Sequence, residues 1–436
     1  MSSFRGVVKT IIPVGVFKKI EPFGHLLESI LWNIVYGFPS RGMHVIGVTG
    51  TNGKTTTSFM IHRMLTDAGY KTALMTTVAY GVGNDIIPQE FHMTTVSSKL
   101  LQKRLKEFKK QGVEWLVLET TSHALAQYRV WGVPYEIAVL TNVTHEHLDY
   151  HGTFERYVAA KRKLFELVGR HKSGFGIVNA DDDTAQSYAA AAKRAISYGI
   201  HTGEVQASEV EVQATGSTYS VKLGDEPLYI HCNIPGEFNV YNSLAAVAVG
   251  QHLGLTPEQI QQGIANLKSV EGRMNTISEG QPFSVIIDYA HTPDSFERLL
   301  SDVRKSTKGK LVVLFGSAGR RDEAKRAIQG EIAGKYGDEV VLTEEDDRDI
   351  DGNEILAQIA EGAEKAGKVK DQNLFLILDR PDAIQFAMTR VNSPEDTVIL
   401  LGKGHEKTIE RADGEHPWDE AGEARKAITK LTGKEQ

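Results

Sequence analysis

The segment from Gly47 to Thr57 has the residue types of a loop that holds phosphate groups. It reads Gly47-Val48-Thr49-Gly50-Thr51-Asn52-Gly53-Lys54-Thr55-Thr56-Thr57, between an apolar run and a helical stretch. Glycines let backbone N–H groups face phosphate oxygens, and the N-terminus of the next helix adds a positive dipole end. Lys54 is placed to reach the outer phosphates and Thr55 to bind Mg²⁺. The segment predicts a nucleoside triphosphate site, although Val48 stands where the strict Gly-x4-Gly-Lys-Ser/Thr pattern has glycine.

Two further segments carry groups that suit a metal beside a nucleotide. Glu119 ends the apolar run that starts at Trp115, and the segment from Thr141 to Gly152 holds three histidines and two acids. Carboxylates at strand ends are typical Mg²⁺ ligands in such sites. Zinc is the alternative for the histidine-rich segment, but it contains no cysteine. Magnesium beside the nucleotide fits better.

Short apolar runs alternate with helical stretches from Met43 onward, as in a mostly parallel sheet covered by helices. Buried strands are expected at 45–49, 115–118, 137–140 and 176–178. Near-alternating apolar residues between 205 and 233 predict a small antiparallel meander inserted in this domain. Because ligands gather at the carboxyl ends of parallel strands, the glycine-rich loop and Glu119 are expected at one edge of the sheet.

A second series of strands and helices follows residue 275. The expected strands are 284–288, 311–315, 339–343, 374–378 and 397–401, and the expected helices are 294–303, 322–335, 352–366 and 382–391. Five such steps suit one open Rossmann-like domain. The predicted fold class is therefore α/β, with a central, mostly parallel nucleotide-binding domain at 46–271 and a Rossmann-like domain at 272–436. The linker 269–274 is the expected hinge.

Residues 1–45 are expected to form a reduced N-terminal helical element. Apolar residues recur at steps of three and four from Ile20 to Tyr36, which places them on one face of a helix. We expect this face to pack on the next domain. A helix lying on a membrane surface is the alternative, and Lys18 and Lys19 are few basic groups for it.

Composition excludes several classes of protein. Lys and Arg number 49 against 56 Asp and Glu, a net charge of −7, which disfavours general nucleic-acid binding. Hydrophobic residues make up 41% of the chain, enough for sizeable cores. The single cysteine, Cys232, permits no intramolecular disulfide, and there is neither an 18-residue apolar run nor a signal peptide at the start. A cytoplasmic, monomeric protein that acts on small molecules is expected.

Seven ordered motifs together resemble the Mur ligase family, and within it the MurE type, which adds the third residue of the peptidoglycan stem peptide. They are Thr49–Thr56, Glu119–His123, Asn142–Gly152 with Lys161, Phe238–Asn242, Gly272–Met274, Asp288–Pro293 and Gly402–Glu406. The match runs in order from about residue 43 to 410. The resemblance implies an acid–amino-acid ligase of cell-wall synthesis, and thereby of cell shape and division.

The resemblance implies a reaction that uses ATP and Mg²⁺ to convert a carboxylate into an acyl phosphate, which an amine then attacks. ATP would be held by Gly50, Thr51, Asn52, Gly53, Lys54, Thr55, Thr56, Asn239 and Asn242. Mg²⁺ would be held by Thr55, Glu119, His147 and a carbamylated Lys161. Catalytic roles would fall to Lys54, Glu119, His147 and Lys161.

The resemblance also implies positions for the two substrates that are joined. UDP-N-acetylmuramoyl-L-Ala-D-Glu would meet Thr94, Thr95, Thr121, Gln127 and Arg129. The incoming amino acid, diaminopimelate or lysine, would meet Arg321, Glu345, Asp346, Asp347, Arg348, Gly402 and Glu406. The motif that reads Asp-Asn-Pro-Arg in diaminopimelate ligases is Glu345-Asp346-Asp347-Arg348 here. Members of this type have a separate uridine-binding domain at the front, so a reduced surface for UDP, or an acceptor without it, is expected.

Two other functions remain open. One is a ligase of the same fold with an acceptor that carries no UDP, such as a folate that receives glutamate. The motifs at Asp288 and Gly402 favour the MurE type over it. The other is a nucleotide-binding subunit that has lost ligation. Such a subunit would be expected to have other residues at one or more of four positions. All four expected residues are present, namely Lys54, Glu119, His147 and Lys161.

Overall fold

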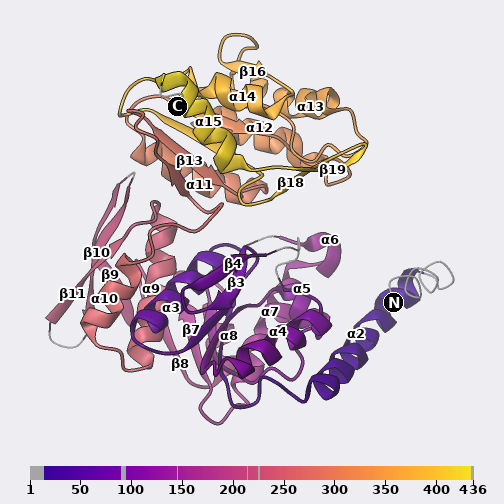
Figure 1. Ribbon diagram of the computed structural model, residues 1–436, viewed down its shortest axis with the longest axis vertical. Coiled ribbons are helices and arrows are strands. Elements are labelled where there is room, and N and C mark those ends of the chain that lie inside the picture. Colours follow the sequence, from indigo (N-terminus) through magenta and orange to yellow (C-terminus); the bar gives the residue numbers. More distant parts are fainter. Residues whose placement is uncertain (1–13, 90–94, 145, 214, 224–225, 434–436) are drawn as a thin grey trace. The chain divides into compact units, whose positions relative to one another are not determined.

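The computed structural model describes residues 14–89, 95–144, 146–213, 215–223 and 226–433. The chain divides into two compact units. The first comprises Met1–Glu209, Tyr219–Ile230 and Val240–Asn266, and the second comprises Val210–Thr218, His231–Asn239 and Leu267–Gln436. Both sheets are covered by helices, which confirms the predicted α/β fold class (Figure 1). The domain boundaries at 45 and 271 stay predictions.

The larger sheet has eleven strands in the order β11-β10-β9-β8-β7-β6-β1-β5-β2-β3-β4. Their bounds are β1 His44–Thr49, β2 Thr72–Met75, β3 Ala79–Val82, β4 Asp85–Pro88, β5 Trp115–Glu119, β6 Tyr135–Leu140, β7 Phe175–Asn179, β8 Ala195–Gly199, β9 Val205–Gln213, β10 Gly216–Leu223 and β11 Glu226–Cys232. Strand β1 pairs in parallel with β5 on one side and β6 on the other. Its apolar run is buried on both faces, as a central parallel strand requires.

The helices that go with this sheet begin at residues suited to helix starts. Thr153 caps α7 by accepting a hydrogen bond from the N–H of Arg156, and Thr256 forms a capping box with Gln259 at α10. The bounds are α3 Lys54–Asp67, α4 Ser98–Lys110, α5 Ser122–Ala126, α6 Leu148–His151, α7 Phe154–Val168, α8 Ala185–Ala192, α9 Glu237–His252 and α10 Pro257–Ala265. Helix α3 follows β1 directly after the glycine-rich loop.

The four strands expected in this part of the chain are confirmed, with ends extended by one or two residues. The meander expected at 205–233 is present as β9, β10 and β11, but it continues the large sheet, because β9 pairs in parallel with β8. Strands β2, β3 and β4 have four residues each and were not anticipated. Segments that short carry too few alternations to show a two-residue period.

The smaller sheet lies in the second unit and has the order β12-β13-β17-β14-β15-β16. Its strands are β12 Asn275–Ile277, β13 Ser284–Asp288, β14 Leu311–Phe315, β15 Glu339–Leu342, β16 Leu374–Leu376 and β17 Thr397–Leu401. All pairs are parallel except β12 with β13. The five strands expected here are confirmed.

Helices and one hairpin complete the second unit. The helices are α11 Pro293–Ser306, α12 Ala324–Tyr336, α13 Gly352–Lys365, α14 Arg380–Met388 and α15 Glu420–Thr432. The hairpin consists of β18 Thr408–Arg411 and β19 Gly414–Pro417, with Glu410 opposite Glu415. The four expected helices are confirmed within a few residues, whereas α15 and the hairpin were not predicted.

Helix α2 (Val14–Tyr36) packs on the part of the chain that follows it, as expected, but not through its apolar face. Its apolar face is the exposed one: five large side chains keep between 47% and 68% of their surface open, namely Phe23, Leu27, Leu31, Ile34 and Val35. The buried face is polar and carries His25, Ser29 and Asn33. Ser29 donates to the carbonyl of Tyr128 (2.8 Å) and Asn33 to that of Trp131 (2.8 Å). Those loop carbonyls need donors, so hydrogen bonding orients the helix.

Candidate functional site

The glycine-rich loop after β1 needs glycine at two positions. Gly50 has a φ of 151°, and a Cβ there would lie 1.8 Å from the hydroxyl of Thr141. Gly53 has a φ of 79°, and its Cβ would lie 2.1 Å from Oδ1 of Asn242. Only glycine combines such backbone angles with so close an approach. Asn242, on α9, is therefore packed directly on the loop, whereas Asn239 donates to the carbonyl of Pro235 (2.7 Å).

Residues from the end of β6 hold the loop in shape. Thr141 donates to the carbonyl of Asn52 (2.6 Å), and the side-chain amide of Asn142 contacts the Asn52 N–H and carbonyl at 3.0 Å each. The hydroxyl of Thr51 lies 3.1 Å from that of Tyr157, which is buried on α7. The roles of Thr141 and Tyr157 were missed. The position of Thr141 directly after an expected strand was the available signal.

Glu119 and Thr55 meet at the same sheet edge. The Thr55 hydroxyl donates to Oε2 of Glu119 (3.0 Å), and the backbone N–H of Thr77 donates to the same oxygen (2.9 Å). Glu119 is 1% exposed. A hydroxyl beside a carboxylate is a pair of hard oxygen donors, which fits Mg²⁺. The expected proximity of Glu119 to the loop is thus confirmed.

Lys161 is a buried lysine that points at the loop. It is 2% exposed, and its Nζ donates to the carbonyl of Gly50 at 2.5 Å. Burial, with the charge of Lys54 nearby, lowers the pKa of the Lys161 amine well below its usual range, although Glu146 and Glu119 oppose the shift. The shift favours the uncharged form of the amine. Lys54 itself donates to the carbonyl of Thr51 (2.7 Å).

The rings of His147 and His151 pack near the ring of His123. The ring of His123 lies 4.7 Å from that of His147 and 5.4 Å from that of His151. His147 has a φ of 56° and lies 3.6 Å from Glu146, and His151 contacts the hydroxyl of Ser122 (3.0 Å). Among the residues that the structure describes, which omit His145, no three His, Cys, Asp or Glu side chains are grouped to hold a metal ion. Nothing here supports zinc.

Three of the residues expected to meet the acceptor, Thr95, Thr121 and Arg129, are linked by hydrogen bonds. The hydroxyls of Thr95 and Thr121 lie 3.2 Å apart, and that of Thr95 also donates to the Glu119 carbonyl (3.2 Å). Arg129 donates to the carbonyl of Thr95 (2.9 Å), and the buried amide oxygen of Gln127 has no hydrogen-bond partner among the described residues. Thr94 lies outside the described residues.

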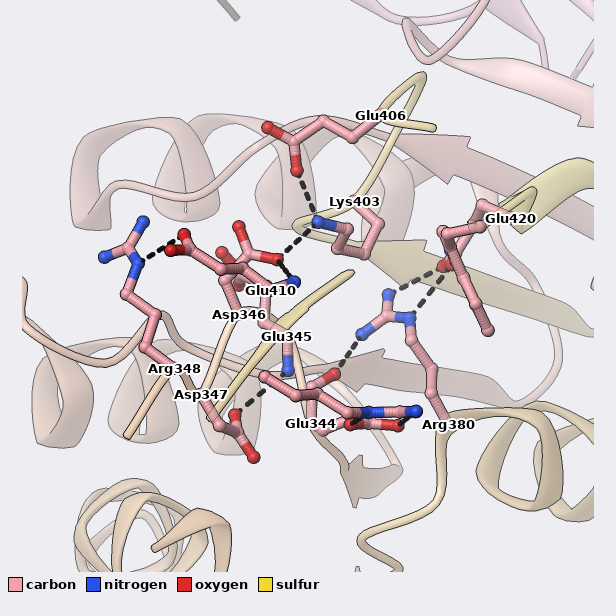
Figure 2. Close-up of polar contacts among 12 residues, drawn as sticks. Glu344, Glu345, Asp346, Asp347, Arg348, Arg380, Lys403, Glu406, Glu410 and Glu420 are labelled. Atoms are coloured by element: carbon pink, nitrogen blue, oxygen red, sulfur yellow. Dashed lines mark hydrogen bonds and ion pairs between the residues drawn. The ribbon is translucent and has the colours of Figure 1, made fainter. Parts of the chain in front are cut away.

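In the second unit, Asp346 and Glu406, two of the residues expected to meet the amino acid, contact a buried lysine (Figure 2). Lys403 is fully buried and donates to Asp346 (2.8 Å) and Glu406 (2.6 Å). These carboxylates raise the pKa of its ammonium, although burial lowers it. Gly402 has a φ of 98°, and a Cβ there would lie 2.7 Å from Oε2 of Glu345. The sequence analysis did not assign Lys403 a role.

The arginines near this cluster differ in whether they have hydrogen-bond or ion-pair partners. Arg348 donates to Glu410 (2.7 Å) and to the carbonyl of Gly319 (2.6 Å), and Arg320 makes a two-point contact with Asp349. Arg411 makes a two-point contact with Glu344 at 2.9 and 2.6 Å. Arg321 is exposed and makes no hydrogen bond or ion pair within the described part of the chain.

Two carboxyls of the 345–348 segment lie in a strongly buried setting. Burial raises the pKa of Glu345 to about 7, against the nearby charges of Lys325 and Lys403. Burial also raises the pKa of Asp347, to about 6. Neither carboxyl forms an ion pair with a described residue. A cation placed beside them would favour their charged forms.

Replacing Gly53 with alanine is expected to weaken ATP binding by at least tenfold, because the new Cβ would clash with Asn242. Gly83→Ala is the matched control: its φ is 59°, but nothing lies within 4 Å of its Cβ. The control bears only the backbone strain, about 1 kcal/mol. Calorimetric titration with ATP measures both. Equal affinities in the two variants would show that the close approach to Asn242 does not matter.

Comparison with known proteins gives consistent matches along most of the chain. The family described as Mur ligase middle domain matches residues 48–250, and that described as Mur ligase, glutamate ligase domain matches 272–404. A UDP-N-acetylmuramyl-tripeptide synthetase of Roseiflexus sp. (strain RS-1) is 40% identical over 410 residues, which cover 91% of this chain and 80% of the relative. A UDP-N-acetylmuramoyl-L-alanyl-D-glutamate--2,6-diaminopimelate ligase of Geobacillus thermodenitrificans (strain NG80-2) is 37% identical, covering 97% and 87%.

Solved structures show the same likeness. A structure of a UDP-N-acetylmuramoyl-L-alanyl-D-glutamate--2,6-diaminopimelate ligase matches with a TM-score of 0.65 and 30% identity, over 90% of this chain and 79% of that one. Folylpolyglutamate synthase of Mycobacterium tuberculosis, complexed with ADP and AMPPCP, matches with a TM-score of 0.70 over 95% and 99%. At 15% identity the second match concerns the fold alone.

Proposed function

This chain belongs to the Mur ligase family, and we propose that it is an ATP-dependent ligase that adds the third amino acid to UDP-N-acetylmuramoyl-L-Ala-D-Glu in peptidoglycan synthesis. The observation that carries the proposal is the meeting of the glycine-rich loop, Glu119 and Lys161 at one edge of the sheet. The names of relatives that cover most of the chain support this acceptor.

The proposed reaction has two steps. The γ-phosphoryl group of ATP passes to the acceptor carboxylate, which gives an acyl phosphate and ADP. The amine of the amino acid then forms the amide bond, and phosphate leaves with the former carboxylate oxygen. Mg²⁺, when bound, neutralises charge on the transferred group. In this chain the loop from Gly50 to Thr56 would hold the phosphates, and Thr55 with Glu119 would hold the ion.

We propose that Lys161 is carbamylated. In its uncharged form the amine can attack CO₂, which forms an N–C bond and releases a proton, so that the side chain ends in an anionic carbamate whose oxygens can bind a metal ion. The nitrogen keeps one hydrogen, which can still donate to the Gly50 carbonyl. The charged ammonium of an unmodified Lys161 would be destabilised here, because the site is buried and the positive charge of Lys54 is near. His147 stays a proposed member of the metal site.

We also infer that the added amino acid has one carboxylate and a cationic end, as lysine has, rather than the two carboxylates of diaminopimelate. The inference rests on the ligase function. Arg348 is engaged by Glu410 and Arg320 by Asp349, which leaves Arg321 for a single carboxylate. The carboxyls of Glu345 and Asp347, which form no ion pair with a described residue, suit a nearby amine, and both lysine and diaminopimelate carry one, so the preference rests on the arginines.

A ligation assay tests both proposals with ATP, UDP-muramoyl-dipeptide and lysine, ornithine or meso-diaminopimelate, read by phosphate release and mass spectrometry. We expect phosphate release only when acceptor and amino acid are both present, with lysine or ornithine preferred at least tenfold. Release that needs no acceptor would contradict the ligase function. A preference for diaminopimelate in the ligation assay would contradict the proposed specificity but not the ligase function. Tighter calorimetric binding of diaminopimelate than of lysine would do the same.

Glu410→Gln is expected to release Arg348 and raise kcat/KM for diaminopimelate about tenfold relative to lysine, the size of one charge-assisted hydrogen bond. Glu415→Gln is the matched control, because Glu415 lies opposite Glu410 on the same hairpin and is exposed. The ratio for this control should equal that of the parent protein. An unchanged ratio in Glu410→Gln would remove Glu410 as a determinant of specificity.

A further inference from the structure

The exposed apolar face of α2 lies beside a row of lysines on α4. Ser29 of α2 and Ser98 of α4 have hydroxyls 2.6 Å apart, so the two helices are in contact. The Nζ atoms of Lys99 and Lys106 lie 4.8 Å above the ring of Trp32 and 5.7 Å above that of Tyr36. Lys99 and Lys106 succeed each other along α4 as Trp32 and Tyr36 do along α2. The lysine row therefore runs along the side of α2.

The lysine row is local and strongly basic in a chain of net charge −7. Lys99, Lys103 and Lys106 are spaced at four and three residues, which puts them on one face of α4, and all three are exposed. Glu107 is the sole acid between Ser98 and Lys110, and it lies 4.0 Å from Lys103 in an exposed ion pair, which leaves Lys99 and Lys106 as the stronger cations of the row. The aromatic rings of Trp32 and Tyr36 stand between these cations and the apolar residues of α2.

We propose that α2 and α4 form a docking surface for an anionic lipid bilayer, with the apolar face of α2 inserted among the acyl chains. The surface has the same order of layers as a membrane interface. The apolar stripe corresponds to the acyl chains, the Trp and Tyr rings to the interfacial belt, and the lysine row to the anionic headgroups. The lysines would meet anionic headgroups, to which each basic residue near the surface adds attraction. A second copy docked through the same face would offer no row of acids to these lysines, so charge complementarity favours an anionic lipid surface.

The proposal concerns attachment to a surface and not a span. No helix in the described part of the chain is long and apolar enough to cross a bilayer. Burial of the five apolar side chains of α2 is the main source of binding, and electrostatic attraction from α4 makes it depend on lipid charge and on salt. The attachment is independent of the ligase function.

Cosedimentation of the full chain with vesicles tests the proposal. We expect binding to vesicles of phosphatidylglycerol and phosphatidylcholine in equal parts, and at least about tenfold weaker binding to phosphatidylcholine alone. The double variant Leu27→Glu, Leu31→Glu should lose at least about tenfold in partition, because it loses apolar burial and adds charge facing anionic lipid. The triple variant Lys99→Gln, Lys103→Gln, Lys106→Gln should lose most of its binding at about 0.1 M salt.

The matched control is the double variant Ile328→Glu, Val369→Glu, which alters two exposed apolar side chains of the second unit and should bind as the parent does. Because Leu27 and Leu31 are exposed, their variants should keep the parent thermal stability. Parent protein that stays in the supernatant with anionic vesicles would overturn the proposal, as would undiminished binding of the Leu27 and Leu31 variant. A dimer in sedimentation velocity that this variant abolishes, without vesicle binding, would assign the surface to a second copy.

Discussion

Lys161→Ala is expected to lower kcat by at least about a hundredfold, because it removes the proposed oxygen ligand of the metal site. The structure accounts for the size of the effect: the amine is fully enclosed and hydrogen-bonded to the loop, so water cannot simply take its place. Short carboxylates such as acetate should restore part of the activity by supplying an oxygen ligand. Steady-state phosphate release with and without acetate measures this.

Lys163→Ala is the control for this prediction, since Lys163 lies two residues further along the same helix, over the ring of Tyr128. It should change kcat by no more than about twofold. Labelled bicarbonate, with carbon-13, should give a carbamate signal in the parent and in Lys163→Ala but not in Lys161→Ala. Full activity of a folded Lys161→Ala variant, or the same carbamate signal in it, would rule out the role.

Arg380→Met is expected to destabilise the second unit by about 3–5 kcal/mol, because it leaves the Glu420 carboxylate buried without its cation. Both side chains are 0% exposed, and the guanidinium donates to Glu420 at 2.9 and 2.6 Å. It also donates to the carbonyls of Glu344 and Leu401. The double variant Arg380→Met, Glu420→Leu should recover much of the loss, since no buried charge remains.

Urea unfolding measures these free energies, and a convenient probe exists. Of the four tryptophans, Trp418 alone belongs to the second unit. Its indole N–H donates to Glu420 (2.8 Å). With Trp32, Trp115 and Trp131 changed to Phe, fluorescence reports the second unit, whose transition need not coincide with that of the first. Lys335→Met breaks an exposed ion pair and should cost no more than about 1 kcal/mol. A similar cost for Arg380→Met would contradict the prediction.

Long elements with clear periodicity were predictable from the sequence, and so was the position of the nucleotide loop. Strands such as Leu311–Phe315 are uniformly apolar and buried, so their type and length are visible in the residues alone. Residues that follow such strands, as Glu119 does, were placed correctly because parallel strands end at a common edge. Short strands that exist through pairing, such as Asp85–Pro88, were not visible.

The failures share a physical cause: they depend on hydrogen bonds to distant parts of the chain. The polar face of α2 is buried because Tyr128 and Trp131, about a hundred residues away, offer carbonyls. Periodicity reports which residues share a face, but not which face meets the protein. The engagement of Arg348 by Glu410 was likewise unpredictable, because Glu410 belongs to a hairpin that the sequence did not reveal.

The central position of β1 in the large sheet has a consequence for amide hydrogen exchange. The loop and Glu119 extend from β1 and β5, which have neighbouring strands on both sides, whereas β4 and β11 are the edges of the sheet. Amides of edge strands exchange through local fraying, but those of β1 and β5 exchange only when much of the sheet opens. The glycine-rich loop and Glu119 are therefore anchored in the slowest-exchanging strands, and edge opening leaves them in place.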